Sequence, residues 1–461
     1  MQQNQTEALG REPVGKLLIK LAAPAVAAQI INLLYNLVDR MYIGRIAGVG
    51  RDALTGVGVC LPLIMIISAF AALIGMGAAP RASIFLGRGD RENAEKTLGN
   101  SFTMLFVLSL ILTVIFRVFA EPMLLAFGAS PETMPFGASY MKIYALGTLF
   151  VQMTLGLNAF ISAQGFSRTS MLTVLIGAVT NIILDPILIF GFGLGVAGAA
   201  WATIISQCIS MVWILFFLTG KKTTIRIKRK HLGIKPRILF PCLALGLSPF
   251  IMQATESLIA VCFNTSLYKY GGDLAVGAMT ILSSVMQFAM LPLMGLTQGA
   301  QPIISYNFGA GNALRVKQTF RYLLITCVVY AAVLWGAVQL FPSVFVKLFN
   351  SDVALVELGS KALRVYMAVS FVFGVQLACQ HTFIALGNAK SSLFLALLRK
   401  IILLIPLIYV MPMLFTADKT MAVLMAEPVA DFLAVATTVV LFVVQFKKAL
   451  RGMDEPPVVA E

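Results

Sequence analysis

An acid, an amide and a proline lie close together in one long apolar segment, where they could form an ion site. Asn181 and Asp185 are four residues apart, so a helix places them on one face, and Pro186 follows directly. An acid at the centre of a membrane-spanning helix costs roughly 2.5–3.5 kcal/mol, so its presence there needs a reason. Pro186 cannot donate to the carbonyl of Ile182, which predicts a kink and a free oxygen. The alternative is a capped break between two helices, which Asp-Pro also favours.

A second acid ends a polar stripe in the first apolar segment. Spacings of 3, 3, 1 and 3 keep the stripe on one helix face, and its members are Gln29, Asn32, Tyr35, Asn36 and Asp39. A polar stripe in a membrane-spanning segment must face protein or water rather than lipid. Arg40 follows Asp39, so a salt bridge near the outer end of the helix is the alternative interpretation.

The fourth and sixth segments add smaller polar candidates. Asn158 lies between Thr154 and Ser162 in a run with a spacing of four, and Ala199 and Thr203 are also four apart. Such spacings place each set on one helix face. Small residues alone more often indicate close helix packing, which is the alternative for Ala199 and Thr203.

The second half of the chain offers acids, amides and methionines that could line a substrate cleft. Glu256 has no basic residue near it in the sequence, which makes it a functional candidate. The predicted cleft residues are Gln253, Glu256, Gln287, Met286, Met290, Gln380 and Asp431. Methionines would suit a pocket that accepts many ligands, although such a stripe more often packs in a core.

The composition is that of a polytopic membrane protein. Of the 461 residues, 59% are hydrophobic and 12% are charged, whereas soluble domains have about 45–50% apolar and about 25% charged residues. The net charge of +15 resides mainly in loops, so we expect no nucleic-acid partner. The six cysteines form no CxxC pair, and no HExxH motif or His/Cys cluster occurs. We therefore expect no disulfide, no cofactor and no catalytic metal, and we see no convergent nucleophile and base of an enzyme.

Apolar runs separated by glycine, proline and charged residues predict twelve membrane-spanning helices. Their expected ranges are 17–38, 53–80, 99–120, 135–164, 169–190, 195–219, 240–268, 275–305, 318–342, 358–386, 391–415 and 420–446. Of the 35 lysines and arginines, 25 are assigned to one side, among them Arg399, Lys400 and the basic loop 220–237. The positive-inside rule then places both termini and this loop in the cytoplasm. We expect the loop to be a solvated linker that also contacts anionic lipid.

The chain contains an internal duplication. An offset of 222 residues, constant over about ninety residues, pairs Gly77-Ala-Ala-Pro80 with Gly299-Ala-Gln-Pro302 and Gly165 with Gly387. Each repeat has six predicted helices, so both halves enter the membrane from the same side, and a cleft is expected between them. The predicted fold is therefore all-α, with two pseudo-symmetric six-helix bundles formed by residues 1–228 and 229–461.

These features resemble the MATE family of multidrug and toxic compound extrusion transporters over almost the whole chain. The motifs that carry the resemblance are Tyr35-Asn-Leu-Val-Asp39-Arg-Met-Tyr-Ile-Gly44 and Asn181-Ile-Ile-Leu-Asp185-Pro186, with weaker support from the Gly-x-Gly-Asp turn at 87–90 and its repeat at 309–312. The sequence looks closest to the MepA-like bacterial branch. The resemblance implies a V-shaped protein of two six-helix lobes around a central cleft.

The resemblance also implies a function. It implies a multi-pass protein of the bacterial plasma (inner) membrane that exports cationic drugs by antiport with H⁺ or Na⁺ and so confers antibiotic resistance. Its partners would be small-molecule cations and membrane lipids, and we expect a monomer. In the branch with an amino-terminal ion site, the matching positions here are Asp39, Asp185, Asn181, Thr203, the carbonyl of Ala199, Tyr35 and Asn158. Na⁺ would bind at Asp39 and Asp185, but two acids equally suit a proton relay.

Other interpretations remain open. Another branch of the family uses an acid in the seventh helix, which Glu256 resembles, and an Asp in the tenth, where this chain has Gln376 and Gln380. A lipid-linked oligosaccharide flippase of the same superfamily would be expected to line its cleft with Arg and Lys for pyrophosphate. A membrane enzyme or a channel is the alternative from a different class, but a channel would favour symmetric polar rings.

Overall fold

The described part of the computed structural model comprises residues 3–349, 352–451 and 453, and it is helical almost throughout, without a strand. The amino-terminal half contains α1 (Gln3–Arg11), α2 (Val14–Gly44), α3 (Gly50–Gly87), α4 (Arg91–Val118), α5 (Ala120–Ala126), α6 (Met134–Leu146), α7 (Thr148–Ala163), α8 (Ser167–Pro186) and α9 (Val196–Thr219). The carboxyl-terminal half contains α10 (Pro236–Gly309), α11 (Ala313–Leu340), α12 (Pro342–Lys347), α13 (Val353–Tyr366), α14 (Phe373–Ala385), α15 (Ala389–Leu397), α16 (Ile405–Leu414) and α17 (Lys419–Leu450). Two π-helical stretches interrupt this pattern, at Ile187–Gly191 and Leu398–Leu404.

These helices account for twelve membrane crossings. Among the described residues, nine helices are long and apolar enough to cross a membrane, and two bent pairs, α6 with α7 and α13 with α14, add one crossing each. The 74 residues of α10 would extend about 110 Å as one straight helix, far beyond a hydrocarbon core of about 30 Å. Its path breaks at Gly272, where φ is 63° and ψ is −159°, a conformation that suits glycine. α10 is therefore two spans, and the twelve predicted helices are confirmed.

The duplication is visible in the backbone. α4 and α11 each have 28 residues, and the offset of 222 superposes their bounds. The residues that cap them also correspond: Asp90 accepts from the N–H of Asn93, and Asn312 accepts from the N–H of Arg315. The paired glycines of the turns share a left-handed conformation, with φ of 90° at Gly165 and 75° at Gly387. The two halves thus repeat one pattern of caps and turns.

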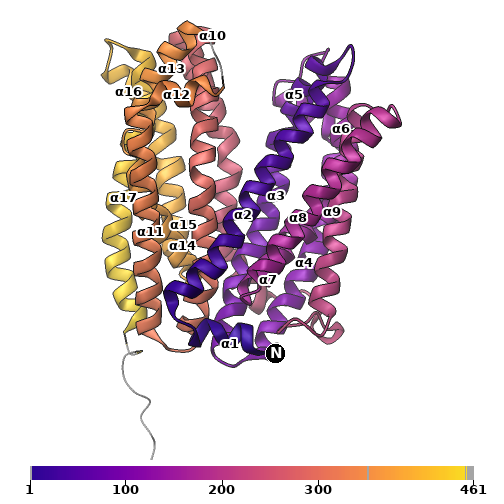
Figure 1. Cartoon of the computed structure of the whole chain (residues 1–461), viewed down its shortest axis with the longest axis vertical. Helices are drawn as coiled ribbons and strands as arrows, with labels where there is room; N and C mark the ends of the chain where they lie inside the picture. Colours follow the sequence, from indigo (N-terminus) through magenta and orange to yellow (C-terminus); the bar gives the residue numbers. More distant parts are fainter. Residues whose placement is uncertain (1–2, 350–351, 452, 454–461) are drawn as a thin grey trace, which may run out of the picture.

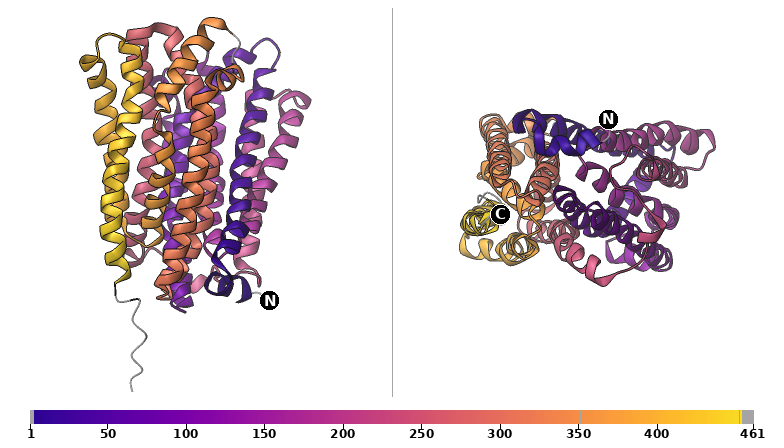
Figure 2. Two further views of the ribbon diagram at one scale, coloured as in Figure 1. Left: turned by 60° about the vertical axis from the view of Figure 1, so that its left-hand side comes forward. Right: turned by 90° about the horizontal axis from the view of Figure 1, so that it is seen from below.

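The helices form two groups that lie close together at one end and separate at the other. In Figure 1 the groups meet at the end where α1 lies, and Figure 2 shows the same molecule from the side and from below. Each half has its own apolar cores, but the first turns of α2 pack against the other half. Leu17 and Leu21 belong to a buried cluster with Leu293 and Ile303 of α10. α2 therefore begins on one half and continues into the other.

The short helix α1 is bonded to both halves. The hydroxyl of Thr6 donates to the carbonyl of Gln164 in the amino-terminal half, at 3.0 Å. In the carboxyl-terminal half, Asn307 Nδ2 donates to the carbonyl of Leu9 at 2.8 Å, and Arg315 donates to the same carbonyl at 3.1 Å. These bonds hold the two groups of helices together at this end.

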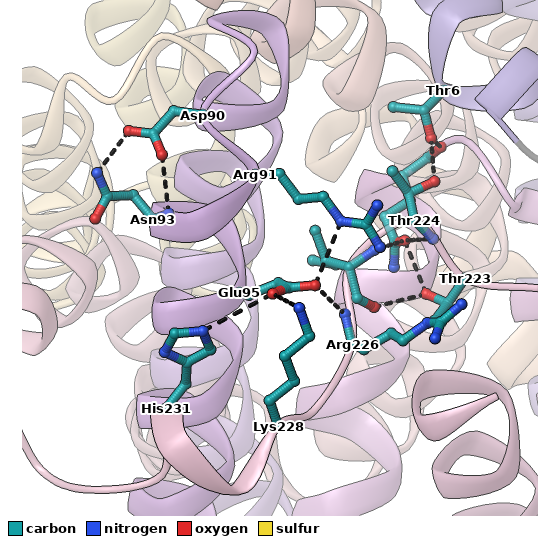
Figure 3. Close-up of polar contacts among 12 residues, drawn as sticks. Thr6, Asp90, Arg91, Asn93, Glu95, Thr223, Thr224, Arg226, Lys228 and His231 are labelled. Atoms are coloured by element: carbon teal, nitrogen blue, oxygen red, sulfur yellow. Dashed lines mark hydrogen bonds and ion pairs between the residues drawn. The ribbon is translucent and has the colours of Figure 1, made fainter. Parts of the chain in front are cut away.

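The basic connector between the halves is fastened to the amino-terminal helices (Figure 3). Gln164 Oε1 accepts from the hydroxyl of Thr223 and from the backbone of Thr224 and Ile225. The buried carboxylate of Glu95 on α4 pairs with Lys228 at 2.5 Å and with Arg91 at 3.4 Å, and it also lies beside His231. The expected solvated linker is thus an ordered segment along this face, while its contact with lipid stays a prediction.

The same connector stays on the amino-terminal half up to the start of α10. Asn100 Oδ1 accepts from the backbone N–H of Lys235 at 2.7 Å, and Thr103 accepts from Gly233 at 3.0 Å. α10 begins at the next residue, Pro236. The predicted boundary between residues 228 and 229 stays a prediction, but by contact residues 229–235 lie with the first half.

Candidate functional site

Asp39 and Asp185 converge from two helices of the amino-terminal half. Asp39 lies near the end of α2, Asp185 lies near the end of α8, and their carboxyl groups interact directly. Asp185 is fully buried, and Asn181, one helical turn earlier, donates to its Oδ1 at 3.3 Å. The spacing of four on one helix face therefore sets the amide against the acid, as the sequence predicts.

Three oxygens of this pair of acids and its amide have no hydrogen-bond donor. They are Asp39 Oδ1, Asp185 Oδ2 and Asn181 Oδ1, all shielded from solvent. In the described residues neither aspartate forms an ion pair, and the suggested bridge to Arg40 is not made. Burial and mutual repulsion both disfavour two bare carboxylates, so such a site favours a shared proton or a cation held by oxygens.

The remaining predicted ion ligands divide between this site and a cavity. Tyr35 on α2 is close enough to both aspartates to interact with them electrostatically. The hydroxyl of Thr203 donates to the carbonyl of Ala199 at 3.0 Å, so these two candidates already contact each other. Asn158 lines the cavity, where its Nδ2 donates to the carbonyl of Ser170 at 3.4 Å. Tyr35 also lines that cavity and so lies between the acids and the cavity.

A tyrosine of α6 joins the site, although no motif in the sequence marked it as a candidate. Tyr140 is 4% exposed and interacts with both Asp39 and Thr203. Its ring stacks on that of Tyr144, with the centroids 6.0 Å apart. Its stacking neighbour Tyr144 is paired with Tyr366 by the duplication. That pairing gave no indication of an acid near either tyrosine.

The helix after Asp185 changes its winding rather than simply bending. α8 ends at Pro186 and continues as the π-helix Ile187–Gly191. α9 approaches this stretch so closely that a Cβ atom at Gly198 would lie 2.7 Å from the carbonyl carbon of Leu188. Close packing, the alternative for Ala199 and Thr203, is therefore present beside the acid pair. π-helical turns are frequent at functional sites, because they can shift without loss of the helix.

A cavity of about 440 Å³ lies between the two halves. Hydroxyl, amide and small apolar side chains from α2, α3, α7, α8, α9, α10 and α14 line it. Among the residues described, no Asp, Glu, Lys or Arg contributes to this lining. Of the predicted cleft residues, Gln253 lines the cavity, whereas Glu256, Gln287, Met286, Met290, Gln380 and Asp431 do not. A role for those six in the cleft stays a prediction.

Three acids of the carboxyl-terminal half are paired with bases of the second π-helix. Arg399 Nε lies 2.6 Å from Asp431 Oδ1, and its Nη2 lies 3.3 Å from Glu427 Oε1. Lys400 Nζ lies 2.6 Å from Glu256 Oε1. The guanidinium also stacks over the ring of Phe373, at 4.8 Å from the centroid. These partners could not be predicted from the sequence, because 144 residues separate Glu256 from Lys400.

The assignment of Arg399 and Lys400 to the cytoplasmic face was wrong. Their span begins at Ala389, so Arg399 lies about 15 Å along the helix at 1.5 Å per residue. Lys400 is only 6% exposed. Acids from other helices supply the counter-charges, buried ones for Arg399 and the half-exposed Glu256 for Lys400, so these two bases do not need the cytoplasm.

Known proteins share this fold and sequence. The MatE family model matches residues 24–187 and again residues 249–410. Multidrug export protein MepA of Staphylococcus haemolyticus (strain JCSC1435) is 29% identical over 420 residues, which are 91% of this chain and 92% of that protein. MepA of Staphylococcus aureus (strain NCTC 8325 / PS 47) is 28% identical over 415 residues, 90% of this chain and 91% of the relative.

Solved structures agree with these matches. A crystal structure of MATE in the bent conformation superposes with a TM-score of 0.91 at 21% identity, covering 98% of this chain and 99% of the other. The MATE multidrug transporter DinF-BH superposes with a TM-score of 0.88 at 31% identity and covers 97% of this chain and 99% of the other. These proteins are transporters rather than enzymes. The resemblance seen in the sequence is confirmed, and the chain belongs to the MatE family of multi-pass membrane transporters.

Proposed function

We propose that this protein is a secondary active multidrug exporter that couples the inward movement of H⁺ or Na⁺ to the export of organic cations. The observation that carries the proposal is the contact between Asp39 and Asp185, in which one oxygen of each carboxyl group is buried without a donor, while Tyr35 lies between them and the cavity. The MepA relatives are named as multidrug export proteins, which supports the same function.

The coupling step follows from the electrostatics of the acid pair. A proton shared by the carboxyl groups, or Na⁺ held by their oxygens, removes the repulsion between Asp39 and Asp185. Asp185 directly precedes Pro186 and the π-helix Ile187–Gly191, so loading the site changes the forces on the most irregular part of that helix. Different cavity shapes in the loaded and empty states would give substrate and ion opposite preferences, which is the requirement for antiport.

The charge distribution favours a cationic substrate. Asp39 and Asp185 lie in the amino-terminal half without an ion-pair partner among the described residues, so they give their surroundings a negative potential. The cavity itself is polar and uncharged. An organic cation with apolar rings can therefore enter it without meeting a fixed positive charge, and its own charge is attracted toward the acids.

The rival functions lack support in the cavity. A flippase for lipid-linked oligosaccharides needs basic side chains for its pyrophosphate, and within the described part of the chain none lines the cavity. The two buried bases, Arg399 and Lys400, are instead paired with acids. The described residues that line the cavity also do not form the symmetric ring of polar residues that would indicate a channel.

We further propose that the protein resides in the bacterial plasma (inner) membrane as a monomer, with both termini in the cytoplasm. The support is the clustering of basic residues in the connector at the same end as α1 (Figure 1). Lys230 and Glu132 are exposed near opposite ends of the helices. A single cysteine at Lys230 should be labelled from the cytoplasm and one at Glu132 from outside; the reverse labelling would contradict this orientation.

The decisive experiment reconstitutes the purified protein in liposomes and imposes one gradient at a time. A gradient of H⁺ alone, or of Na⁺ alone, should drive a fluorescent organic cation across the membrane in the opposite direction, and collapsing that gradient with an ionophore should stop the flux. Whichever gradient works identifies the coupling ion. Equal fluxes with and without gradients would contradict coupled antiport.

A further inference from the structure

Two polar side chains on the carboxyl-terminal wall of the cavity each have one buried nitrogen without a hydrogen-bond partner among the described residues. Gln301 comes from the second span of α10, and its Nε2 is buried without a partner among the described residues. His381 comes from α14, is 8% exposed, and its Nδ1 is likewise unpartnered. Because buried polar groups are nearly always hydrogen-bonded, two such groups facing one cavity indicate a ligand that completes them.

Their neighbours are satisfied, so the free atoms are not a general property of this wall. Gln298, one helical turn before Gln301, accepts from Gln29 Nε2 at 3.1 Å across the two halves. Gln380, directly before His381, donates to Ser248 Oγ at 3.2 Å. The wall thus contains two glutamines of the same chemistry, one bonded within the protein and one not.

The duplication shows that the fold does not require polar side chains here. The offset of 222 pairs Gln301 with Ala79 and His381 with Ala159, and both alanines also line the cavity. At equivalent positions of the two halves, alanine is therefore compatible with the packing. Gln301 and His381 are polar on one wall only. We therefore assign them a role in contacting a bound ligand rather than in packing the helices.

The opposite wall has the complementary property. Asn158 Oδ1 and Gln207 Oε1, both from the amino-terminal half, line the cavity and lack donors. Carbonyl oxygens on this wall suit the positive part of a ligand, whereas the N–H groups of Gln301, and the ring of His381 in the tautomer protonated at Nδ1, suit an acceptor. The cavity is thus polarised across its width without containing a fixed charge.

We infer that Gln301 and His381 form a subsite for a neutral carbonyl group of the substrate, and that they select organic cations bearing an ester, amide or ketone. This inference rests on the proposed function, since it names the class of cation preferred by the same cavity. A carboxylate fits less well, because no Lys or Arg of the described chain lines the cavity to compensate a buried negative charge. A cation without an acceptor would displace water from both groups and leave them unpaired.

Two rhodamine-type cations and one zwitterion of nearly one shape provide the test. Tetramethylrhodamine methyl ester carries the carbonyl, tetramethylrosamine lacks it, and free tetramethylrhodamine replaces it by a carboxylate. Equilibrium binding to the purified protein is measured by fluorescence polarisation. We expect the ester to bind about three- to tenfold more tightly than the rosamine, as one or two neutral hydrogen bonds allow, and the free acid to show no such advantage.

Gln301→Ala and His381→Ala, which copy the alanines of the first half, should each reduce the preference for the ester, and together they should abolish it. Gln376→Ala is the control: it removes a buried glutamine from the helix of His381 that does not line the cavity and whose Oε1 accepts from the hydroxyl of Thr438 at 2.7 Å. It should leave the ratio of the ester and rosamine affinities unchanged. Gln301→Met and His381→Leu replace the alanine variants should these fail to elute as folded protein.

The outcomes separate the inference from the proposed function. No preference in the wild type, a preference unaffected at Gln301 and His381, or an equal loss in Gln376→Ala would each overturn the subsite. Gradient-driven efflux of the rosamine tests coupling without using the subsite. Binding that prefers the ester without any gradient-driven efflux would reject the proposed function and leave the subsite intact.

Discussion

The two halves of the molecule bury acids under different conditions. In the amino-terminal half, Asp39 and Asp185 contact each other and have no base as an ion-pair partner among the described residues. In the carboxyl-terminal half, Arg399 contacts both Glu427 and Asp431. Lys400 contacts Glu256 in the same way. Both sets lie beside a π-helix, but only in the second half does that helix carry the counter-charges.

Under the proposed function, this difference separates a site that exchanges an ion from acids that are held by their bases. Removing one partner of a buried ion pair typically costs about 3–5 kcal/mol, so an acid bound to Arg399 is not readily released to take a proton or Na⁺. Asp39 and Asp185 have no such competitor in the described structure and retain oxygens without donors. The number of acids in a half is therefore a poor guide to coupling, and the bases around them decide it.

The largest effect is expected from the unpaired acids. Asp39→Asn and Asp185→Asn each preserve the side-chain size but prevent the release of a proton and weaken Na⁺ binding. Gradient-driven efflux in proteoliposomes should fall at least about 100-fold for each variant, a loss comparable to removing a charged contact from a buried site. Both proteins should remain folded, because a neutral amide is easier to bury than an acid.

The comparison would break if Asp185→Asn exported normally while Glu256→Gln did not. That result would place the coupling ion in the carboxyl-terminal half. Expression and elution profiles of the variants must be matched, so that a loss of folded protein is not counted as a loss of coupling.

The next effect is expected on stability rather than on coupling. Arg399→Gln leaves Glu427 and Asp431 buried without their base, which should destabilise the protein by about 3–5 kcal/mol. Thermal unfolding of the purified protein, followed by tryptophan fluorescence, measures the change.

Neutralising one acid at the same time sharpens this test. Arg399→Gln combined with Asp431→Asn should recover part of the lost stability, since the pair interacts at 2.6 Å. Additive losses in the double variant would show that the ion pair does not carry the effect.

A smaller effect is expected at Glu256. Its own side chain is 51% exposed and lies outside the acid pair of Asp39 and Asp185. Glu256→Gln leaves Lys400, whose side chain is 7% exposed, without its counter-charge, which affects stability rather than coupling. Efflux should stay within about threefold of the wild type, as for other partly exposed pairs. Glu357→Gln, which disrupts the exposed pair with Lys361, serves as a control for a charge change outside the bundles.

An effect on the ion dependence alone is expected at Asn181. Its bond to Asp185 is 3.3 Å long, and its Oδ1 has no donor. Asn181→Ala should raise the ion concentration needed for half-maximal efflux by about three- to tenfold, as for one neutral hydrogen bond, without changing the maximal rate. A lower maximal rate at unchanged ion dependence would assign Asn181 to substrate movement instead.

Local patterns in the sequence predicted the spans, the duplication and the acid pair. The spacing of Asn181 and Asp185 fixes their contact on one helix, and the apolar runs fix where helices begin and end. Contacts between distant segments could not be predicted in this way. Lys400 reaches Glu256 across 144 residues, and the rotation of an almost wholly apolar helix depends on packing rather than on its own sequence. For the same reason, the charge of Arg399 misplaced it at the membrane surface.

The fastening of the connector leaves almost no slack between the halves. A free chain from Thr223 to Lys235 could reach about 40 Å at roughly 3.3 Å per residue. Here Gln164 and Glu95 hold its first part, and Asn100 holds Lys235 one residue before α10 begins. The connector therefore fixes the start of α10 beside α4 and does not act as a flexible linker. A movement of one half against the other must therefore either keep the start of α10 beside Asn100 or break the hydrogen bond between Asn100 and Lys235.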